Sequence, residues 1–291
     1  MADEIQADRS LKHQLKVIRW KIRRMQVARK WGSKEVSGTP AVLGNAMPKS
    51  GSHLIIQVLQ GLTRVGPFVN PGFPPVNRAE DNHKLVEAAI LKNIEQMQSG
   101  DIRYGYIHTR QPFIGALTRP GKAMVFVYRD PRDMLVSHVF YATDMHPGHG
   151  MHQYYTEVLS SMEERLNAAI QGVDEKGAEL INVKERYLNY LGWLNIPEAL
   201  CLRFEDLVQD QEASFRRLLT YLEGRGMRLQ VSQETAIEAL RSSIAPHRSG
   251  TFRKGKPGSW KEYFTPQNKQ IFKEIAGDLL IQMGYEKDLD W

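Results

Sequence analysis

Short apolar runs alternate along the chain with longer stretches of helical periodicity. The apolar runs predict strands over residues 41–46, 104–108, 123–128 and 199–204. The periodic stretches predict helices over residues 51–63, 83–98, 132–141, 154–171, 176–191, 205–224 and 265–283. Because strands that alternate with helices build parallel sheets, we expect a single α/β domain with a mainly parallel central sheet flanked by helices.

The segment before the first strand is periodic and strongly basic. Its apolar residues recur at helical spacing: Leu11, Leu15, Ile18, Ile22 and Met25. Residues 11–34 also hold nine Lys and Arg and no Asp or Glu. We therefore interpret residues 1–38 as a basic amphipathic helix or extension, followed by a domain over residues 39–291. Three roles stay open for the helix: packing its apolar stripe on the domain, which we favour, docking on a membrane or protein partner, or binding nucleic acid.

The charge and composition of the chain indicate which partners and which cellular compartment to expect. The chain has 39 basic and 33 acidic residues, so without the nine basic residues of 11–34 the count is 30 against 33, or −3. The basic character therefore belongs to one segment and says little about the partner of the globular body, for which we expect no nucleic acid. No apolar run reaches the length of a membrane span or a signal peptide, and Cys201 is the one cysteine. We expect a cytoplasmic protein whose Cys201 serves packing.

Three stretches far apart in the chain carry the chemistry. They are Pro-Lys-Ser-Gly-Ser-His at residues 48–53, Tyr-Arg-Asp-Pro-Arg-Asp-Met-Leu-Val-Ser at 128–137, and Arg-Lys-Gly-Lys-Pro-Gly-Ser-Trp-Lys at 253–261. The first two fall where a predicted strand turns into a helix, and the third is a basic loop rich in glycine. Since helix N-termini and basic side chains both attract anions, the three stretches predict one clamp for a nucleotide-like donor with two separate phosphate groups.

The first stretch has the features of a phosphate-binding turn. Gly51 allows close approach of the backbone, Ser50 and Ser52 offer hydroxyl groups, and Lys49 is a mobile cation. It is not a Walker A loop, because Gly-x-x-x-x-Gly-Lys-[Ser/Thr] is absent, and this disfavours a nucleoside-phosphate kinase. Taken alone, an ordinary surface turn explains the stretch equally well.

The three stretches together resemble the sulfotransferases that use 3′-phosphoadenosine 5′-phosphosulfate (PAPS), from about residue 40 to residue 285. The resemblance implies a P-loop-like strand–loop–helix in which Lys49, Ser50, Gly51, Ser52 and His53 bind the 5′-phosphosulfate. It assigns the 3′-phosphate to Arg129, Ser137, Arg253, Lys254 and Gly255. It also implies PAPS as co-substrate, adenosine 3′,5′-bisphosphate (PAP) as product, and no metal.

Weaker matches extend the resemblance to the base and the adenine. Tyr-Ile-His at 106–108 resembles the family's Lys-Thr-His, which makes His108 the general base, although Tyr106 replaces a lysine. Phe204 matches the adenine-side segment, and Ser242 and Ile244 match a Thr-Ser-Phe segment near the purine. Since Leu54 and Ile244 stand where the family has aromatic rings, adenine packing is expected to be partly aliphatic.

The resemblance implies transfer of a sulfuryl group from PAPS to a hydroxyl or amine of a small-molecule acceptor. Lys49 would stabilise the transferring group and His108 would take the acceptor proton, with His53 and His138 as alternative bases. His146, His149 and His152 recur at three-residue spacing, for which we favour a solvated or substrate-facing loop over a metal site.

A second hypothesis is a catalytically inactive nucleotide-binding or scaffold protein of the same fold. The presence of both candidate catalytic residues and of the phosphate-binding residues argues against it. Oligomeric state stays open, because Pro266 and Gln270 depart from the family's Lys-x-x-x-Thr-Val-x-x-x-Glu dimer segment.

Overall fold

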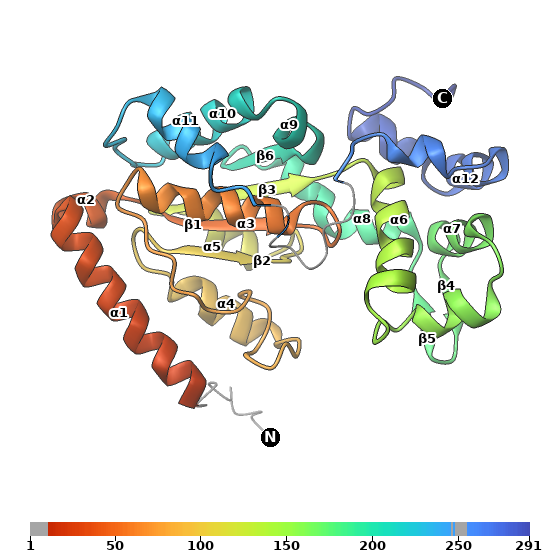
Figure 1. Ribbon diagram of the computed structural model, residues 1–291, viewed down its shortest axis with the longest axis horizontal. Helices are drawn as coiled ribbons and strands as arrows, with labels where there is room; N and C mark the ends of the chain where they lie inside the picture. The colour runs from red at the N-terminus through yellow and green to blue at the C-terminus, as the bar shows by residue number, and fades with distance from the viewer. Residues whose placement is uncertain (1–10, 246, 248–254) are drawn as a thin grey trace. The chain divides into compact units, whose positions relative to one another are not determined.

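The computed structural model describes residues 11–245, 247 and 255–291 (Figure 1). The chain forms two compact units. The first contains residues 1–128 and 192–248, and the second contains residues 129–191 and 249–291. Arg253 and Lys254, two of the predicted phosphate ligands, lie outside the described residues.

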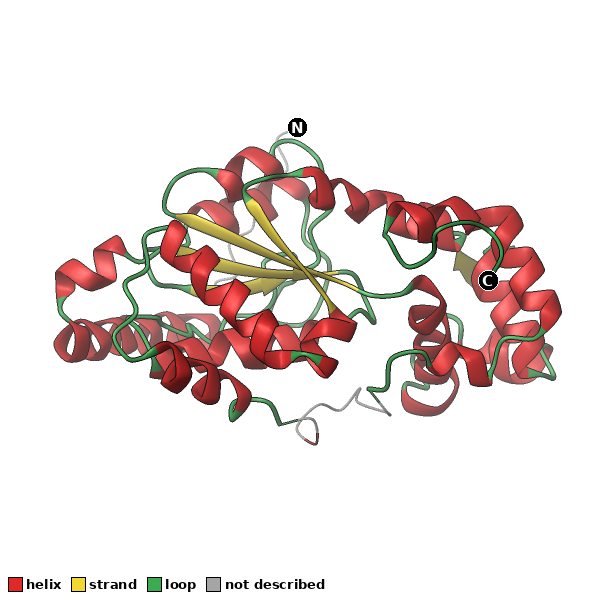
Figure 2. Ribbon diagram, turned by 90° about the horizontal axis from the view of Figure 1, so that it is seen from above, coloured by secondary structure: helices red, strands yellow, loops and turns green. Residues whose placement is uncertain are grey.

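A four-stranded parallel sheet forms the centre of the first unit (Figure 2). Its strands are β1 (Ala41–Ala46), β2 (Ile102–Gly105), β3 (Lys122–Tyr128) and β6 (Ala199–Arg203), in the order β2-β1-β3-β6. Neighbouring residues of a strand point to opposite faces of the sheet. Val42 and Leu43 of β1 are nevertheless both buried, and so are Val125 and Phe126 of β3. Burial on both faces explains the continuous apolar runs in the sequence. The parallel pairing of all three neighbouring strand pairs confirms the predicted sheet.

Helices flank this sheet in the first unit. They are α3 (Ser52–Gly61), α4 (Glu87–Glu95), α5 (Phe113–Thr118), α9 (Phe204–Gln209), α10 (Gln211–Gly224) and α11 (Gln233–Arg241). Short 3-10 turns follow at Leu62–Arg64 (η1) and Gly192–Asn195 (η4). Leu59 of α3, Phe215 of α10 and Leu240 of α11 share one core with Val42 and Val125. This core holds α3 against the sheet. The predicted phosphate-binding stretch at residues 48–53 lies at the start of this helix.

The second unit is mainly helical. It contains α6 (Pro131–Phe140), α7 (Met162–Gln171), α8 (Val183–Leu191) and α12 (Pro266–Gln282), with single turns η2 (Tyr141–Met145), η3 (Tyr154–Val158) and η6 (Ser259–Glu262). A hairpin of β4 (Val173–Glu175) and β5 (Ala178–Leu180) lies between α7 and α8.

Several predicted elements have different limits in the structure. The helix predicted over 154–171 is interrupted at residues 159–161, between η3 and α7. The helix predicted over 176–191 is wrong in its first half, which contains β5. Ser161 starts α7 with a capping box, and Gly177 takes the positive φ that turns the β4–β5 hairpin. The helix predicted over 205–224 is divided at Asp210, whose side chain accepts from the Ala213 N–H and caps α10. The short helices α5 and α11 were not predicted, and β2 begins before the predicted strand.

The basic segment forms α1 (Leu11–Trp31) and α2 (Ser33–Gly38), as its periodicity predicts. The favoured interpretation of its apolar stripe is wrong. The stripe does not pack on the domain, since Leu11, Ile18 and Met25 are each more than half exposed. No helix in the described parts of the chain combines the length and the hydrophobicity that a membrane span needs.

Candidate active site

The loop between β1 and α3 has an unusual backbone at Lys49. The Ser50 N–H donates to the Met47 carbonyl oxygen at 3.1 Å, which closes a turn with Pro48 and Lys49 at its centre. Lys49 has φ 65°, a left-handed conformation that glycine adopts more readily than lysine. Such a conformation costs energy in a residue with a Cβ, which makes Lys49 a candidate functional residue.

The start of α3 has no side-chain cap and no acidic residue in its first turn, and its N-cap residue is Gly51. The amide groups of the first helical turn and the positive end of the helix dipole can therefore attract an anion. The neighbouring Ser50 is fully buried, and within the described residues its hydroxyl has no hydrogen-bond partner. A phosphate or sulfate oxygen at this loop would satisfy that hydroxyl.

Phe204, the first residue of α9 directly after β6, contacts the same loop. A Cβ added to Gly51 would lie 2.6 Å from the Phe204 ring, so only glycine allows the ring to approach this closely. Gly51 also has φ 99°, in the left-handed region.

We expect Gly51→Ala to lower the free energy of unfolding by about 1–3 kcal/mol, because it combines a strained φ with a ring clash. Urea unfolding measures this change. Gly38→Ala is the matched control, since a Cβ there meets nothing within 4 Å. Equal stability of the two variants would show that Gly51 is not sterically required.

The predicted purine-side residues lie against α3. The Gln57 side chain binds both the N–H and the carbonyl of Ala245, at 2.9 and 3.0 Å. Ser242 accepts from Arg64 at 3.1 Å, and Ile244 packs against the core that contains Phe204. Phe204, Ser242 and Ile244 therefore belong to the same unit as the loop at 48–53.

His108 follows β2 in a segment that is fixed on both sides. The Asn45 side chain accepts from the Ile107 N–H at 2.8 Å and donates to the Ile107 carbonyl at 2.9 Å. Trp193 donates its indole N–H to that carbonyl, and its backbone N–H donates to Thr109 Oγ1 at 3.1 Å. These contacts restrict the position of the His108 backbone. Sequence reasoning missed Asn45, although a polar residue in a fully buried strand was the available signal.

Two histidines of the first unit have altered pKa values. Burial lowers the pKa of His108 below 6.5, and the charges of Arg110 and Lys84 lower it further. Burial and then the charge of Lys49 lower the pKa of His53. Both imidazoles are therefore neutral at neutral pH, as a proton acceptor must be. The Tyr106 hydroxyl donates to Ser52 at 3.2 Å, so the residue that replaces the family's lysine contacts the loop through its hydroxyl.

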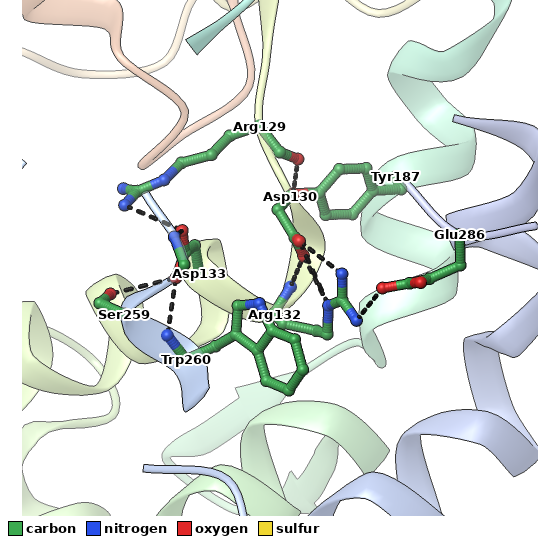
Figure 3. A network of polar contacts seen from close by, with 9 residues as sticks. Arg129, Asp130, Arg132, Asp133, Tyr187, Ser259, Trp260 and Glu286 are labelled. Atoms are coloured by element: carbon green, nitrogen blue, oxygen red, sulfur yellow. Dashed lines mark hydrogen bonds and ion pairs between the residues drawn. The ribbon is translucent and has the colours of Figure 1, made fainter. Parts of the chain in front are cut away.

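Arg129 and Asp133 lie at the start of α6 in the second unit (Figure 3). Arg129 is nearly buried, and its guanidinium lies 3.8 Å from the Asp133 carboxylate. Asp133 accepts shorter bonds from the N–H of Gly258, the hydroxyl of Ser259 and the N–H of Trp260, at 2.7, 3.0 and 2.8 Å. Asp133 thus joins the second and third predicted motifs, a role that the sequence did not reveal. The ion pair with Arg129 is the longest of its contacts.

The next arginine, Arg132, has a structural role. It binds Asp130 at 2.7 Å and Glu286 at 2.6 Å (Figure 3). Its guanidinium also stacks over the rings of Trp260 and Trp291. Asp130 also caps α6 by accepting from the Arg132 N–H at 2.9 Å. This network fixes the backbone on which Arg129 stands.

The remaining predicted residues of the second unit are Ser137, half-buried on α6, and Gly255, with φ 59°. In the histidine-rich loop, the His152 ring contacts the Ala142 carbonyl at 2.7 Å, and the His149 ring packs on those of Tyr141 and His138. Among the described residues, no group of three or more His, Cys, Asp or Glu is arranged to hold a metal. Cys201 of the first unit donates to the Trp193 carbonyl at 3.3 Å, and burial raises its pKa to about 11, as suits a packing residue.

Comparison with known proteins places this chain in a family. Residues 40–284 match the sulfotransferase domain model, so the chain belongs to the sulfotransferase family. The match covers both compact units, in agreement with the single predicted domain.

Curated relatives are distant. The chain is 24% identical to 3-alpha-hydroxysteroid sulfotransferase of Cavia porcellus over 52% of its length and 54% of the relative, so it spans about half of that protein. It is 25% identical to Sulfotransferase 2B1 of Mus musculus, over 78% of this chain and 68% of the relative. It is 26% identical to Flavonol 4′-sulfotransferase of Flaveria chlorifolia, over 55% and 53%.

Solved structures share the fold. Mouse sulfotransferase SULT7A1, complexed with PAP, superposes with a TM-score of 0.58 at 17% identity, over 88% of this chain and 94% of that one. Retinol dehydratase, in complex with androsterone and PAP, gives a TM-score of 0.55 at 14% identity, over 84% and 83%.

Proposed function

We propose that this protein transfers the sulfuryl group of PAPS to a hydroxyl or amine of a small-molecule acceptor. The observation that carries the proposal is the loop at 48–53. It combines a left-handed Lys49, a buried Ser50 hydroxyl without a partner among the described residues, and an uncapped helix start. Each of these features fits a tetrahedral anion, and the chain belongs to the sulfotransferase family.

The proposed donor contacts follow from the chemistry of each group. Lys49, Ser50, Gly51, Ser52 and His53 are assigned to the 5′-phosphosulfate, since they supply amides, hydroxyls and a cation. Phe204, Ser242 and Ile244 are assigned to the adenine side. Arg129, Ser137 and Gly255 are assigned to the 3′-phosphate, together with Arg253 and Lys254 outside the described residues. Arg129 suits this role because guanidinium binds phosphate bidentately.

Two side chains are proposed to act in the chemical step. When bound, PAPS supplies a sulfuryl group with PAP as its leaving group. Lys49 neutralises the negative charge that develops on the oxygen bridging the sulfur and the departing phosphate. The amides at the start of α3 stabilise the same charge. His108 accepts the proton of the attacking hydroxyl or amine, because its lowered pKa keeps it neutral.

The acceptor is proposed to be a small organic molecule. Two of the relatives are named for a hydroxysteroid and a flavonol, and one solved structure of retinol dehydratase contains retinol. A panel of sterols, phenols and amines is therefore the first set to test with PAPS.

Calorimetric titration with PAP, with 5′-AMP as control, tests the donor assignment. Tight binding of PAP and weak binding of AMP are expected, because only PAP carries the 3′-phosphate. Equal affinities, or ATP binding more tightly than PAPS, would overturn it. Binding of PAP without transfer to any acceptor in the panel would favour the catalytically inactive scaffold.

A pH profile tests the proposed base. We expect the acidic limb of kcat/KM to lie below pH 6.5, since burial and the charges of Arg110 and Lys84 lower the pKa of His108. Arg110→Gln removes one positive charge, so it should move the limb to higher pH. His108→Asn should lower kcat by about 100- to 10,000-fold, whereas His53→Asn should not. A limb that does not respond to Arg110→Gln would argue against His108 as the base.

A further inference from the structure

Helix α1 attaches to the first unit through its polar face. The Trp20 indole N–H and the Arg24 guanidinium donate to the same oxygen of Asp101 at 2.8 and 2.9 Å. Lys16 binds Glu80 at 2.5 Å, and Arg23 donates to the Asn70 carbonyl at 2.7 Å. Asp101 is almost fully buried, so these bonds form a firm anchor. The side of the helix that contains these four residues is thereby fixed to the rest of the first unit.

The opposite side of α1 is apolar and exposed. At 100° per residue, the apolar stripe lies about half a turn away from the anchoring residues 16, 20, 23 and 24. The stripe residues are Leu11, Leu15, Ile18, Ile22 and Met25, exposed by 73%, 46%, 54%, 44% and 55%. They extend about 21 Å along the helix. An amphipathic helix of a globular protein normally buries this face, so the exposed stripe needs an occupant.

Basic residues border the stripe on both sides. Lys12, Arg19 and Lys30 follow one edge and Lys21 follows the other, and all four are exposed. Residues 11–31 contain no Asp or Glu. An apolar stripe with cationic borders matches the boundary between lipid headgroups and acyl chains, where anionic phosphates lie beside hydrocarbon.

We propose that α1 docks the protein on an anionic lipid surface, with its axis in the plane of the interface and the stripe facing the acyl chains. A second copy of this chain is a poor occupant, because two such helices would bring like charges together with no acid to offset them. Nucleic acid would engage the cations but leave the stripe in water. The lipid surface complements both features.

Vesicle flotation with the full chain tests the docking. The probes are vesicles of phosphatidylcholine alone and vesicles in which about a third of the lipid is phosphatidylglycerol. We expect binding to the anionic vesicles, weak binding to the neutral ones, and a loss of binding as salt rises to about 0.5 M.

Variants separate the stripe from the charges. The stripe variant Leu15→Gln, Ile18→Gln and Ile22→Gln should lower partitioning by at least about 100-fold. The charge variant Lys12→Gln, Arg19→Gln and Lys21→Gln should lower partitioning to anionic vesicles by about 100-fold. The matched control Val86→Gln, Val158→Gln and Leu188→Gln removes three exposed apolar residues away from α1 and should bind as the parent does.

The outcomes are distinct. Thermal unfolding checks that each variant is folded. If the stripe variant does not fold, the charge variant still tests the proposal. Absence of vesicle binding by the parent protein, or unchanged binding by both variants, would overturn the proposal. A dimer in light scattering that the stripe variant dissociates would assign the stripe to a second copy and would equally overturn it. Because the readout is lipid binding, the test does not depend on the proposed sulfuryl transfer.

Discussion

Lys49→Ala is expected to lower kcat by about 100- to 1,000-fold while changing the Kd for PAP by less than about tenfold. The reason is that the lysine charge matters most when negative charge builds up on the departing phosphate. The first-turn amides of α3 and the Ser50 hydroxyl remain available to hold the ground-state anion. Single-turnover kinetics and calorimetry with PAP measure the two quantities separately.

Alanine is the suitable replacement at this position. It keeps a Cβ, so the cost of φ 65° is the same as for lysine, whereas glycine would relieve the strain and alter the loop. Lys92→Ala, on the exposed surface of α4, removes one positive charge elsewhere in the same unit and is the matched control. Equal losses in kcat and in PAP affinity would show that Lys49 contributes to nucleotide binding and not specifically to the chemical step.

Arg129→Ala is expected to weaken PAP binding by about 10- to 100-fold and to leave the weaker binding of 5′-AMP unchanged. The variant removes the proposed bidentate contact to the 3′-phosphate, and a hydrogen bond to a charged group contributes about 1.5–3 kcal/mol. AMP lacks that phosphate, so its affinity reports any general damage to the site. Calorimetric titration with both nucleotides measures the difference.

The fold should tolerate the loss of Arg129. Asp133 keeps its bonds to the Gly258 and Trp260 amides and to Ser259, so its carboxylate stays satisfied. Arg216→Gln, on the exposed face of α10, is the control for removal of one positive charge. Unchanged PAP affinity in Arg129→Ala would reject the assignment of Arg129 to the 3′-phosphate.

Much of the site was predictable because local chemistry marks it. A Pro-Lys-Ser-Gly turn between an apolar run and a helical period requires a tight loop at a helix start, and the structure places it between β1 and α3. The residues that support the site were not predictable in the same way. Asn45, for example, contacts Ile107, which is 62 positions away, and Trp193 contacts Ile107 from 86 positions away. Asp133 contacts Gly258, which is 125 positions away. No local pattern in the sequence specifies such pairs.

The sequence by itself determined the parallel α/β sheet, the tight turn between β1 and α3 and the periodicity of α1, because each follows from short-range patterns of polarity and backbone preference. Tertiary structure decided which face of α1 turns to the domain. Periodicity favoured the apolar stripe, but Glu80 and Asp101 bind the polar face instead, and Asp101 is nearly buried. Periodicity defines the two faces of a helix, whereas the groups that the fold presents to that helix determine which face it binds.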